Sequence, residues 1–204
     1  MKKYLILWFI LLFVIKCTPE NHFAKDPLIN AYKVDNDKLN KEIIKDSLNY
    51  FLYKYNRKWS IQNKQKCIDV LYCGQQEFNI DYKIIMALIS IESRYNITAI
   101  GQNKNSKDFG LCQQNSKYIN YRYKKVEPIL KQYKIKYTNS KFDIAKNIFS
   151  CYMLLRNTND YYDLILFRDF IASYNVGVRG IKQNHTQQIA NKYYERFLKE
   201  YLSI

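Results

Sequence analysis

The stretch Ala87–Asn96 reads Ala-Leu-Ile-Ser-Ile-Glu-Ser-Arg-Tyr-Asn, and it is followed at 106–113 by Ser-Lys-Asp-Phe-Gly-Leu-Cys-Gln. Glu92 lies seven residues after Ile85 and four after Leu88, so it continues the buried stripe of an apolar helix. Burial disfavours a charged carboxylate, which predicts a raised pKa and a neutral acid near neutral pH. Such an acid is suited to protonating a glycosidic oxygen. The alternative is a surface or ion-paired glutamate near a helix end.

Length and composition favour one helical domain. The chain has 204 residues, enough to bury a core, and only 5 Gly and 3 Pro, which disfavours loop-rich and all-β folds. Apolar spacing predicts helices over Asp37 to about Tyr55, Tyr161–Ser173 and Gln187–Tyr201. Start and stop signals predict three more: Ile61–Tyr72, stopped by Gly74; one beginning near Asp81 and running through Ile89; and one beginning at a capping box formed by Ser140 and Asp143. The predicted fold class is mainly α, with a small irregular or β-like turn region near 98–113.

The first residues have the pattern of a targeting segment. Two lysines precede Tyr4–Ile15, an apolar run of 12 residues, which is shorter than a membrane span of about 20 residues and typical of a signal-peptide core. Because Cys17 follows, residues 1–16 resemble a bacterial lipoprotein signal, whose cysteine is lipidated and becomes the mature N-terminus. Lys16 departs from the small residue usual there, and an uncleaved N-terminal anchor is the alternative. Either way, the remaining chain is expected on the periplasmic side of the cell envelope.

The chain after the signal reads as a tether and a basic domain. Residues 17–36 contain two prolines and mixed polar residues without a sustained period, which predicts a tether before a domain at 37–204. Removing 1–16 takes away three lysines and no acid, so the formal charge falls from +15 to +12. A strongly basic exported chain is attracted to anionic cell-wall polymers, phospholipid heads or nucleic acid. The positive residues are scattered and no nucleic-acid module is recognisable, so nucleic acid is not an expected partner. Solvated helix faces account for most of the lysines.

Four cysteines remain once Cys17 is set aside: Cys67, Cys73, Cys112 and Cys151. An even number in an exported chain permits disulfides. On one unbroken helix, however, the first two would lie about 9 Å apart along the axis, beyond bridging distance. Buried free thiols are the alternative, and no spacing here suggests a zinc site.

Four blocks of the chain resemble the soluble lytic transglycosylase (SLT) domain of bacterial cell-wall enzymes, within the lysozyme-like superfamily. The first block is the run 87–96, with its Glu-Ser pair and aromatic-Asn pair. The second is Gly110-Leu111-Cys112-Gln113, where the cysteine replaces the usual Met. The others are Asn147-Ile148 and Ala172-Ser173-Tyr174-Asn175-Val176-Gly177. They occur in the family's order and span a motif core of about 78–194, which predicts a lysozyme-like helical domain.

The resemblance implies cleavage of the β-1,4 bond between N-acetylmuramic acid and N-acetylglucosamine, with a 1,6-anhydro product. Glu92 would be the catalytic acid and base, held by Ser93 and oriented by the Tyr174 hydroxyl. Gln113 and Asn175 are expected to bind substrate, as amides that both donate and accept suit sugar hydroxyls and acetamido groups. Asn147 is a supporting residue of the same pattern. No metal or cofactor is implied, and the expected partners are peptidoglycan glycan strands and, through the lipid anchor, the membrane.

Asp108 keeps a second reaction open. The segment Ser106–Gly110 also resembles the part of animal-type lysozymes that carries a second carboxylate, and two carboxylates about 5 Å apart would support a retaining hydrolase. The Tyr174-Asn175 block belongs to the transglycosylase pattern and favours that reaction, with Asp108 bracing the turn. A non-catalytic peptidoglycan-binding lipoprotein is an alternative of another class, which the intact Glu92-Ser93 pair disfavours. The sequence leaves open an association with a cell-envelope machine.

Overall fold

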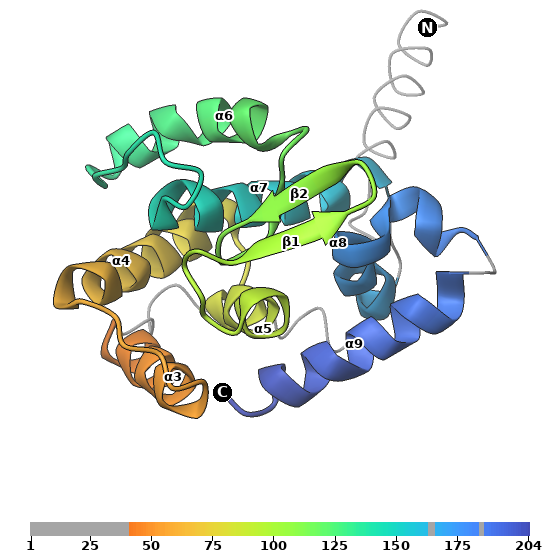
Figure 1. The fold of residues 1–204 in the computed structure, drawn as a ribbon, viewed down its shortest axis with the longest axis horizontal. Helices are drawn as coiled ribbons and strands as arrows, with labels where there is room; N and C mark the ends of the chain where they lie inside the picture. The colour runs from red at the N-terminus through yellow and green to blue at the C-terminus, as the bar shows by residue number, and fades with distance from the viewer. Residues whose placement is uncertain (1–40, 163–165, 184–185) are drawn as a thin grey trace, which may run out of the picture.

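The computed structural model describes residues 41–162, 166–183 and 186–204, and these contain seven α-helices and one small sheet (Figure 1). The helices are α3 (Lys41–Lys54), α4 (Ile61–Phe78), α5 (Tyr82–Ser93), α6 (Ile119–Gln132), α7 (Ile144–Tyr162), α8 (Phe167–Ile181) and α9 (Gln187–Tyr201). The predicted signal at 1–16, Cys17 and the tether lie outside the described residues. No helix within the described ranges is long and apolar enough to cross a membrane. The predicted mainly α fold class is confirmed.

Helix α5 is the centre of the fold. Figure 1 shows it with α3 and α4 on one side and α8 and α9 on the other. It begins after Asp81, whose side chain accepts a hydrogen bond from the Lys83 backbone N–H at 2.8 Å, as predicted from its N-cap character. It ends at Arg94 in a left-handed conformation with φ 51°. Tyr95 follows, fully buried and stacked on Phe51 of α3 with ring centroids 5.1 Å apart. This packing fixes the chain directly after Glu92.

The β-like region predicted near 98–113 is a three-stranded antiparallel sheet in the order β1-β2-β3. Its strands are β1 (Ile100–Asn103), β2 (Ser106–Phe109) and β3 (Gln114–Asn115). Asp108 is the register partner of Gly101 on one side and of Asn115 on the other. The sheet turns the chain between α5 and α6 and brings the Gly-containing turn back against α7, where Asn147 accepts from the Cys112 N–H.

The predicted end of the second helix at Tyr72 is wrong. Helix α4 continues through Gly74 to Phe78 and ends at Asn79, which adopts a left-handed conformation with φ 51°. Gly74 is buried against the ring of Tyr152, and a Cβ at this position would collide with that ring. The glycine therefore allows close packing of α4 on α7 rather than stopping the helix.

Two further helix boundaries differ from the predictions, and one helix was not predicted at all. The Ser140 capping box is wrong, because α7 begins at Ile144 and Asp143 caps it by accepting from the Lys146 N–H at 3.0 Å. The helix predicted at 161–173 is correct in its later part only, because α7 extends to Tyr162 and α8 starts at Phe167 and runs to Ile181. Helix α6 was not predicted.

The four cysteines of the described residues are free thiols. Cys67 and Cys73 both lie on α4, which is unbroken between them. The break that a bridge between them would need is therefore not present. Cys67, Cys112 and Cys151 are buried, and Cys73 is half-buried, which corresponds to the alternative of buried free thiols.

Candidate active site

Glu92 lies in the last turn of α5 and is partly exposed to solvent. Its Oε1 accepts a hydrogen bond of 2.6 Å from the hydroxyl of Tyr193 on α9. Burial raises the pKa of the Glu92 carboxyl above its ordinary value; the Tyr193 hydrogen bond and the charge of Arg196 act against this rise, and the charge of Asp108 adds to it. The site therefore holds a carboxyl that is biased toward its protonated form and still open to a ligand.

Tyr193 is the residue of this site that sequence reasoning missed. It is 2% exposed, and burial, followed by the Glu92 charge, raises its hydroxyl pKa well above the ordinary value. The hydroxyl therefore stays protonated and donates to the carboxylate. The helix that carries it was predicted correctly at 187–201. The sequence pattern predicts that a tyrosine on the apolar stripe of that helix is a core residue. Only the tertiary contact shows that its hydroxyl reaches Glu92.

A second contact fixes α9 against α5. Glu200 accepts hydrogen bonds at one carboxylate oxygen from Ser90 Oγ at 2.7 Å, Lys54 Nζ at 2.7 Å and the Tyr55 hydroxyl at 3.1 Å. Ser90 lies two residues before Glu92 on the same helix. Because α9 is joined to α5 at both Ser90 and Glu92, the position of Tyr193 relative to the carboxyl is set by the packing of the two helices.

Asn147 holds the Gly-containing turn. Its Oδ1 accepts from the Cys112 N–H at 2.7 Å, and its Nδ2 donates to the Phe109 carbonyl at 2.9 Å. Gly110 between them has φ 75°, and a Cβ there would lie 2.6 Å from the Asn147 amide nitrogen. Glycine is required here both by the backbone conformation and by the approach of the amide. The structure thus places Asn147, which is 1% exposed, as a support of the turn.

Gln113 is also engaged within the turn. It has φ 46°, and its Nε2 donates to the Gly110 carbonyl at 2.8 Å and, more weakly, to the Ala99 carbonyl at 3.4 Å. Both donor contacts go to backbone, so the side chain links the turn to the residue preceding β1. Its predicted binding of sugar groups rests on the remaining acceptor atom.

Asp108 links the three strands. Its Oδ2 accepts from Asn103 Nδ2 of β1 at 2.6 Å, and its Oδ1 accepts from Asn115 Nδ2 of β3 at 2.7 Å. The side chain is partly exposed. Each carboxylate oxygen therefore already has an amide partner, and Asp108 acts on Glu92 through its charge, which raises the pKa of that carboxyl.

The structure corrects the predicted contact of Tyr174 with Glu92. The Tyr174 hydroxyl donates to the Cys112 carbonyl at 2.7 Å and accepts from Gln114 Nε2 at 3.1 Å. Arg122 Nη1 in turn donates to Gln114 Oε1 at 2.8 Å. Tyr174 thus ties α8 to the turn and to α6, and Tyr193 makes the contact with Glu92 in its place.

Ser93 and Asn175 are the remaining predicted site residues. The Ser93 hydroxyl donates to the Ile89 carbonyl at 3.1 Å within its own helix, so it does not hold Glu92 as predicted. Asn175 is exposed on α8, two residues before Gly177, where φ 71° and ψ 159° interrupt the helix. Its amide is therefore available to a ligand, and its predicted contact with substrate stays a prediction.

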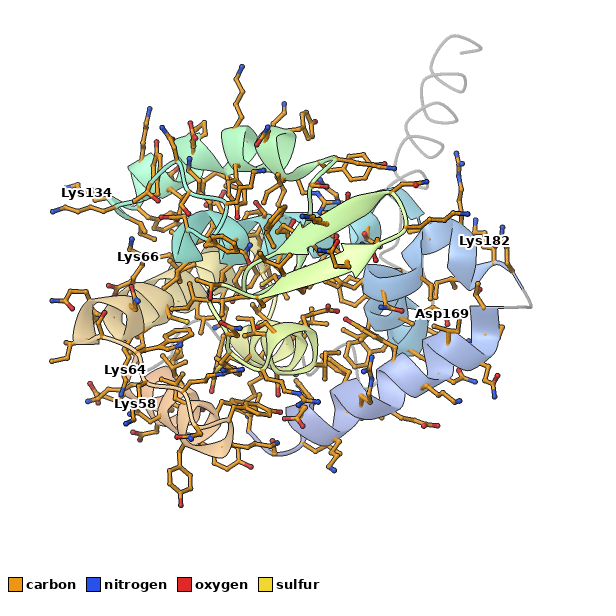
Figure 2. The ribbon with its side chains drawn as sticks, in the orientation of Figure 1. Lys58, Lys64, Lys66, Lys134, Asp169 and Lys182 are labelled. Carbon is orange, nitrogen blue, oxygen red and sulfur yellow. The ribbon has the colours of Figure 1, made fainter. Side chains whose placement is uncertain are left out.

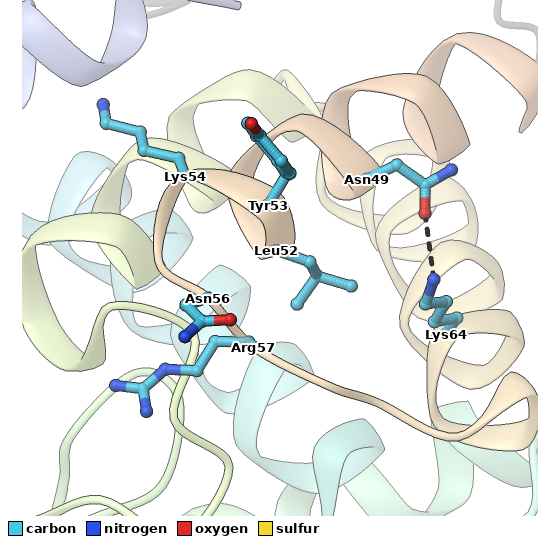
Figure 3. A pocket seen from close by; sticks show the side chains of 7 residues that line it. All are labelled: Asn49, Leu52, Tyr53, Lys54, Asn56, Arg57 and Lys64. Atoms are coloured by element: carbon cyan, nitrogen blue, oxygen red, sulfur yellow. Dashed lines mark hydrogen bonds between the residues drawn. The ribbon is translucent and has the colours of Figure 1, made fainter.

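A separate pocket lies where α3 meets α4. It has a volume of about 560 Å³, and its seven lining residues, shown in Figure 3, include the basic side chains Lys54, Arg57 and Lys64. None of the predicted site residues lines it. Across the described residues, no group of three or more His, Cys, Asp or Glu side chains is placed to hold a metal ion.

The chain matches a known family. The family model of the transglycosylase SLT domain matches residues 72–197 of the 204. No curated protein and no solved structure matches the chain. The resemblance carried by the four sequence blocks is thereby confirmed, and with it a lysozyme-like domain whose function is, in general, peptidoglycan cleavage of the lytic transglycosylase type. The chain therefore belongs to the transglycosylase SLT domain family.

Proposed function

We propose that the protein is a peptidoglycan lytic transglycosylase that cleaves the β-1,4 bond between N-acetylmuramic acid and N-acetylglucosamine, with Glu92 as the only catalytic carboxyl. The observation that carries the proposal is the Glu92 carboxyl itself, partly exposed, with its pKa raised by burial and one oxygen held by Tyr193 at 2.6 Å. A carboxyl with a raised pKa keeps its proton to higher pH than an ordinary glutamic acid and can give that proton to the leaving glycosidic oxygen.

The same carboxyl serves both halves of the proposed reaction. In the first, Glu92 donates its proton to the glycosidic oxygen as the bond to the anomeric carbon breaks. In the second, the Glu92 carboxylate takes the proton of the muramoyl 6-hydroxyl while that oxygen bonds to the anomeric carbon. Glu92 ends protonated, as it began, and the product carries a 1,6-anhydro ring. The substrate's acetamido group supplies the stabilisation that a second carboxylate gives in other glycosidases.

In the proposed reaction Asp108 braces the sheet and is not the nucleophile. Both oxygens of Asp108 accept hydrogen bonds from asparagine side chains of the sheet. Each oxygen keeps a further lone pair, so the choice of transglycosylation rests on the Tyr174-Asn175 block of the transglycosylase pattern and on the family match. The charge of Asp108 adds to burial in raising the pKa of the Glu92 carboxyl, which favours the protonated acid. Export to the periplasmic side of the envelope and lipidation at Cys17 remain part of the proposal.

The test is digestion of purified peptidoglycan by the wild type, Glu92→Gln and the matched control Glu195→Gln. Glu195 is an exposed acid of α9, so its loss removes the same charge away from the site. We expect Glu92→Gln to lose activity by at least about a hundredfold and the control to retain it. Mass analysis of the product ends distinguishes the reactions, since anhydro ends identify transglycosylation and reducing ends identify lysozyme-type hydrolysis.

Two results would reject the proposal. Equal activity of Glu92→Gln and the wild type would remove Glu92 from the mechanism. Binding of peptidoglycan by the wild type without release of soluble fragments would identify a non-catalytic wall-binding protein.

A further inference from the structure

Positive charge is concentrated in one segment of the chain. Residues 117–141 hold eight Lys or Arg and a single acid, a net charge of +7, whereas the whole chain carries +15. Almost half of the excess charge thus lies in 25 residues, although basic residues are scattered along the whole chain. We call it the α6 basic segment, and its cations are Lys117, Arg122, Lys124, Lys125, Lys131, Lys134, Lys136 and Lys141.

These cations face solvent, and the segment's own acid is already paired. All seven lysines are exposed, and Arg122 is half-buried. Glu127 accepts from the buried Lys146 of α7 at 2.6 Å, and Glu77 of α4 accepts from the Tyr133 hydroxyl at 3.1 Å. The positive charge on the outward side is therefore not offset by an acid of the segment itself.

Exposed aromatic rings lie among the cations. Tyr118 and Tyr121 are 55% and 65% exposed. Arg122 lies over the first ring at 5.5 Å and Lys125 over the second at 5.6 Å. Amphipathic rings with a polar end are favoured at the level of lipid headgroups, and Lys and Arg beside them pair with phosphate.

The shape of the segment fits an extended surface rather than a small anion. Helix α6 has 14 residues, a length of about 21 Å, and Figure 1 shows it lying along the outside of the fold. Its apolar side, with Ile119, Tyr123, Val126 and Leu130, is buried against the domain. The helix is thus not free to insert into a bilayer and offers only its basic and aromatic side.

We propose that the α6 basic segment docks the domain onto an anionic phospholipid bilayer. The predicted N-terminal anchor places such a surface within reach, because a 20-residue tether at 17–36 spans at most about 70 Å when extended. Each lysine near an anionic membrane strengthens binding by about fivefold. Docking would hold the domain in one orientation, with α6 toward the lipid and the opposite side of the fold toward the wall.

The test uses the full chain with vesicles of phosphatidylglycerol and phosphatidylcholine or of phosphatidylcholine alone. One variant changes Lys124, Lys125, Lys131 and Lys136 to Gln. A control of identical net charge changes four exposed lysines elsewhere: Lys58, Lys182, Lys192 and Lys199. Figure 2 shows Lys58 and Lys182 on other sides of the fold, away from Lys134 at the end of α6. All proteins keep the same N-terminal segment, so its insertion contributes equally.

We expect the segment variant to lose phosphatidylglycerol-dependent affinity by on the order of several hundredfold, and the control to lose at least tenfold less. Equal losses in the two variants would show an effect of net charge alone and overturn the proposal. Undiminished vesicle binding by the segment variant would do so too, even if its binding to a polynucleotide fell. Peptidoglycan digestion by the segment variant should be unchanged in detergent solution, which separates this proposal from that for Glu92.

Discussion

Removal of the Tyr193 hydroxyl should change the pH at which Glu92 works. In the Tyr193→Phe protein the ring stays in place while the 2.6 Å hydrogen bond to Glu92 Oε1 is lost. A hydrogen bond to a charged group contributes about 1.5–3 kcal/mol, and one pKa unit corresponds to about 1.4 kcal/mol. Since Glu92 is partly exposed, we take the lower end of this range. Losing about 1.5 kcal/mol of interaction with the carboxylate should raise the pKa of Glu92.

The direction in which the pH–rate profile should move follows from the role of the proton on Glu92. Glu92 must be protonated to act as an acid, so activity falls as pH rises through its pKa. Loss of a bond that favours the carboxylate raises that pKa, and the alkaline limb of the pH–rate profile should move to higher pH. The maximal rate should fall as well, by roughly tenfold, because the carboxyl is less well positioned.

Peptidoglycan digestion followed across a range of pH checks this prediction, with Tyr152→Phe as the matched control. Tyr152 is a buried tyrosine of α7 whose hydroxyl donates to the Leu71 carbonyl at 3.0 Å. Its loss should lower stability and leave the alkaline limb where it is. A limb that stays in place in Tyr193→Phe, or moves to lower pH, would refute the reasoning.

Two further predictions concern stability. Gly110→Ala should lower the free energy of unfolding by about 2–4 kcal/mol, since its φ is 75° and its Cβ would meet the Asn147 amide at 2.6 Å. Gly177→Ala, at φ 71° and ψ 159°, has open space around it but a backbone conformation essentially restricted to glycine, and should cost about 1–3 kcal/mol; urea denaturation measures both, and a smaller loss in Gly110→Ala than in Gly177→Ala would contradict the role given to Asn147. Glu200→Gln should cost about 2–3 kcal/mol at neutral pH. Hydrogen bonds from Lys54 and Ser90 outweigh burial and lower the Glu200 pKa, so its contribution is present above the ordinary pKa of about 4.3 and is lost as pH falls through the lowered value. The difference in melting temperature from the wild type should thus shrink below about pH 4, and a constant difference would be the contrary result.

Local sequence patterns predicted the elements that pack by simple periodicity. The stripe ending at Glu92 and the helix at 187–201 follow directly from apolar spacing. Helix α6 has buried residues at suitable spacing, but Pro128 within it is a helix-breaking signal. Gly74 shows the opposite error, because a glycine inside a helix can mark close packing as well as an end. Only the partner helix distinguishes the two cases.

The candidate site shows the same division between local and tertiary information. The Gly110 turn and Asn147 were identified as parts of one pattern, and the structure joins them by hydrogen bonds. Which tyrosine meets Glu92 depended on how α8 and α9 pack against α5, and no local pattern distinguishes Tyr174 from Tyr193. Both carry a hydroxyl on a largely buried ring, so the choice between them is made by tertiary geometry.

The surroundings of Glu92 explain why one carboxyl suffices in the proposed reaction. Burial and the charge of Asp108 favour its protonated form, which the first step needs, while Tyr193 and Arg196 favour the carboxylate, which the second step needs. Because these influences oppose one another, neither protonation state is strongly excluded, and a single group can pass between them. Asp108 contributes to this balance through its charge while its oxygens brace the sheet. In the proposed reaction the nucleophile comes from the substrate, and its 6-hydroxyl is the group that yields an anhydro ring.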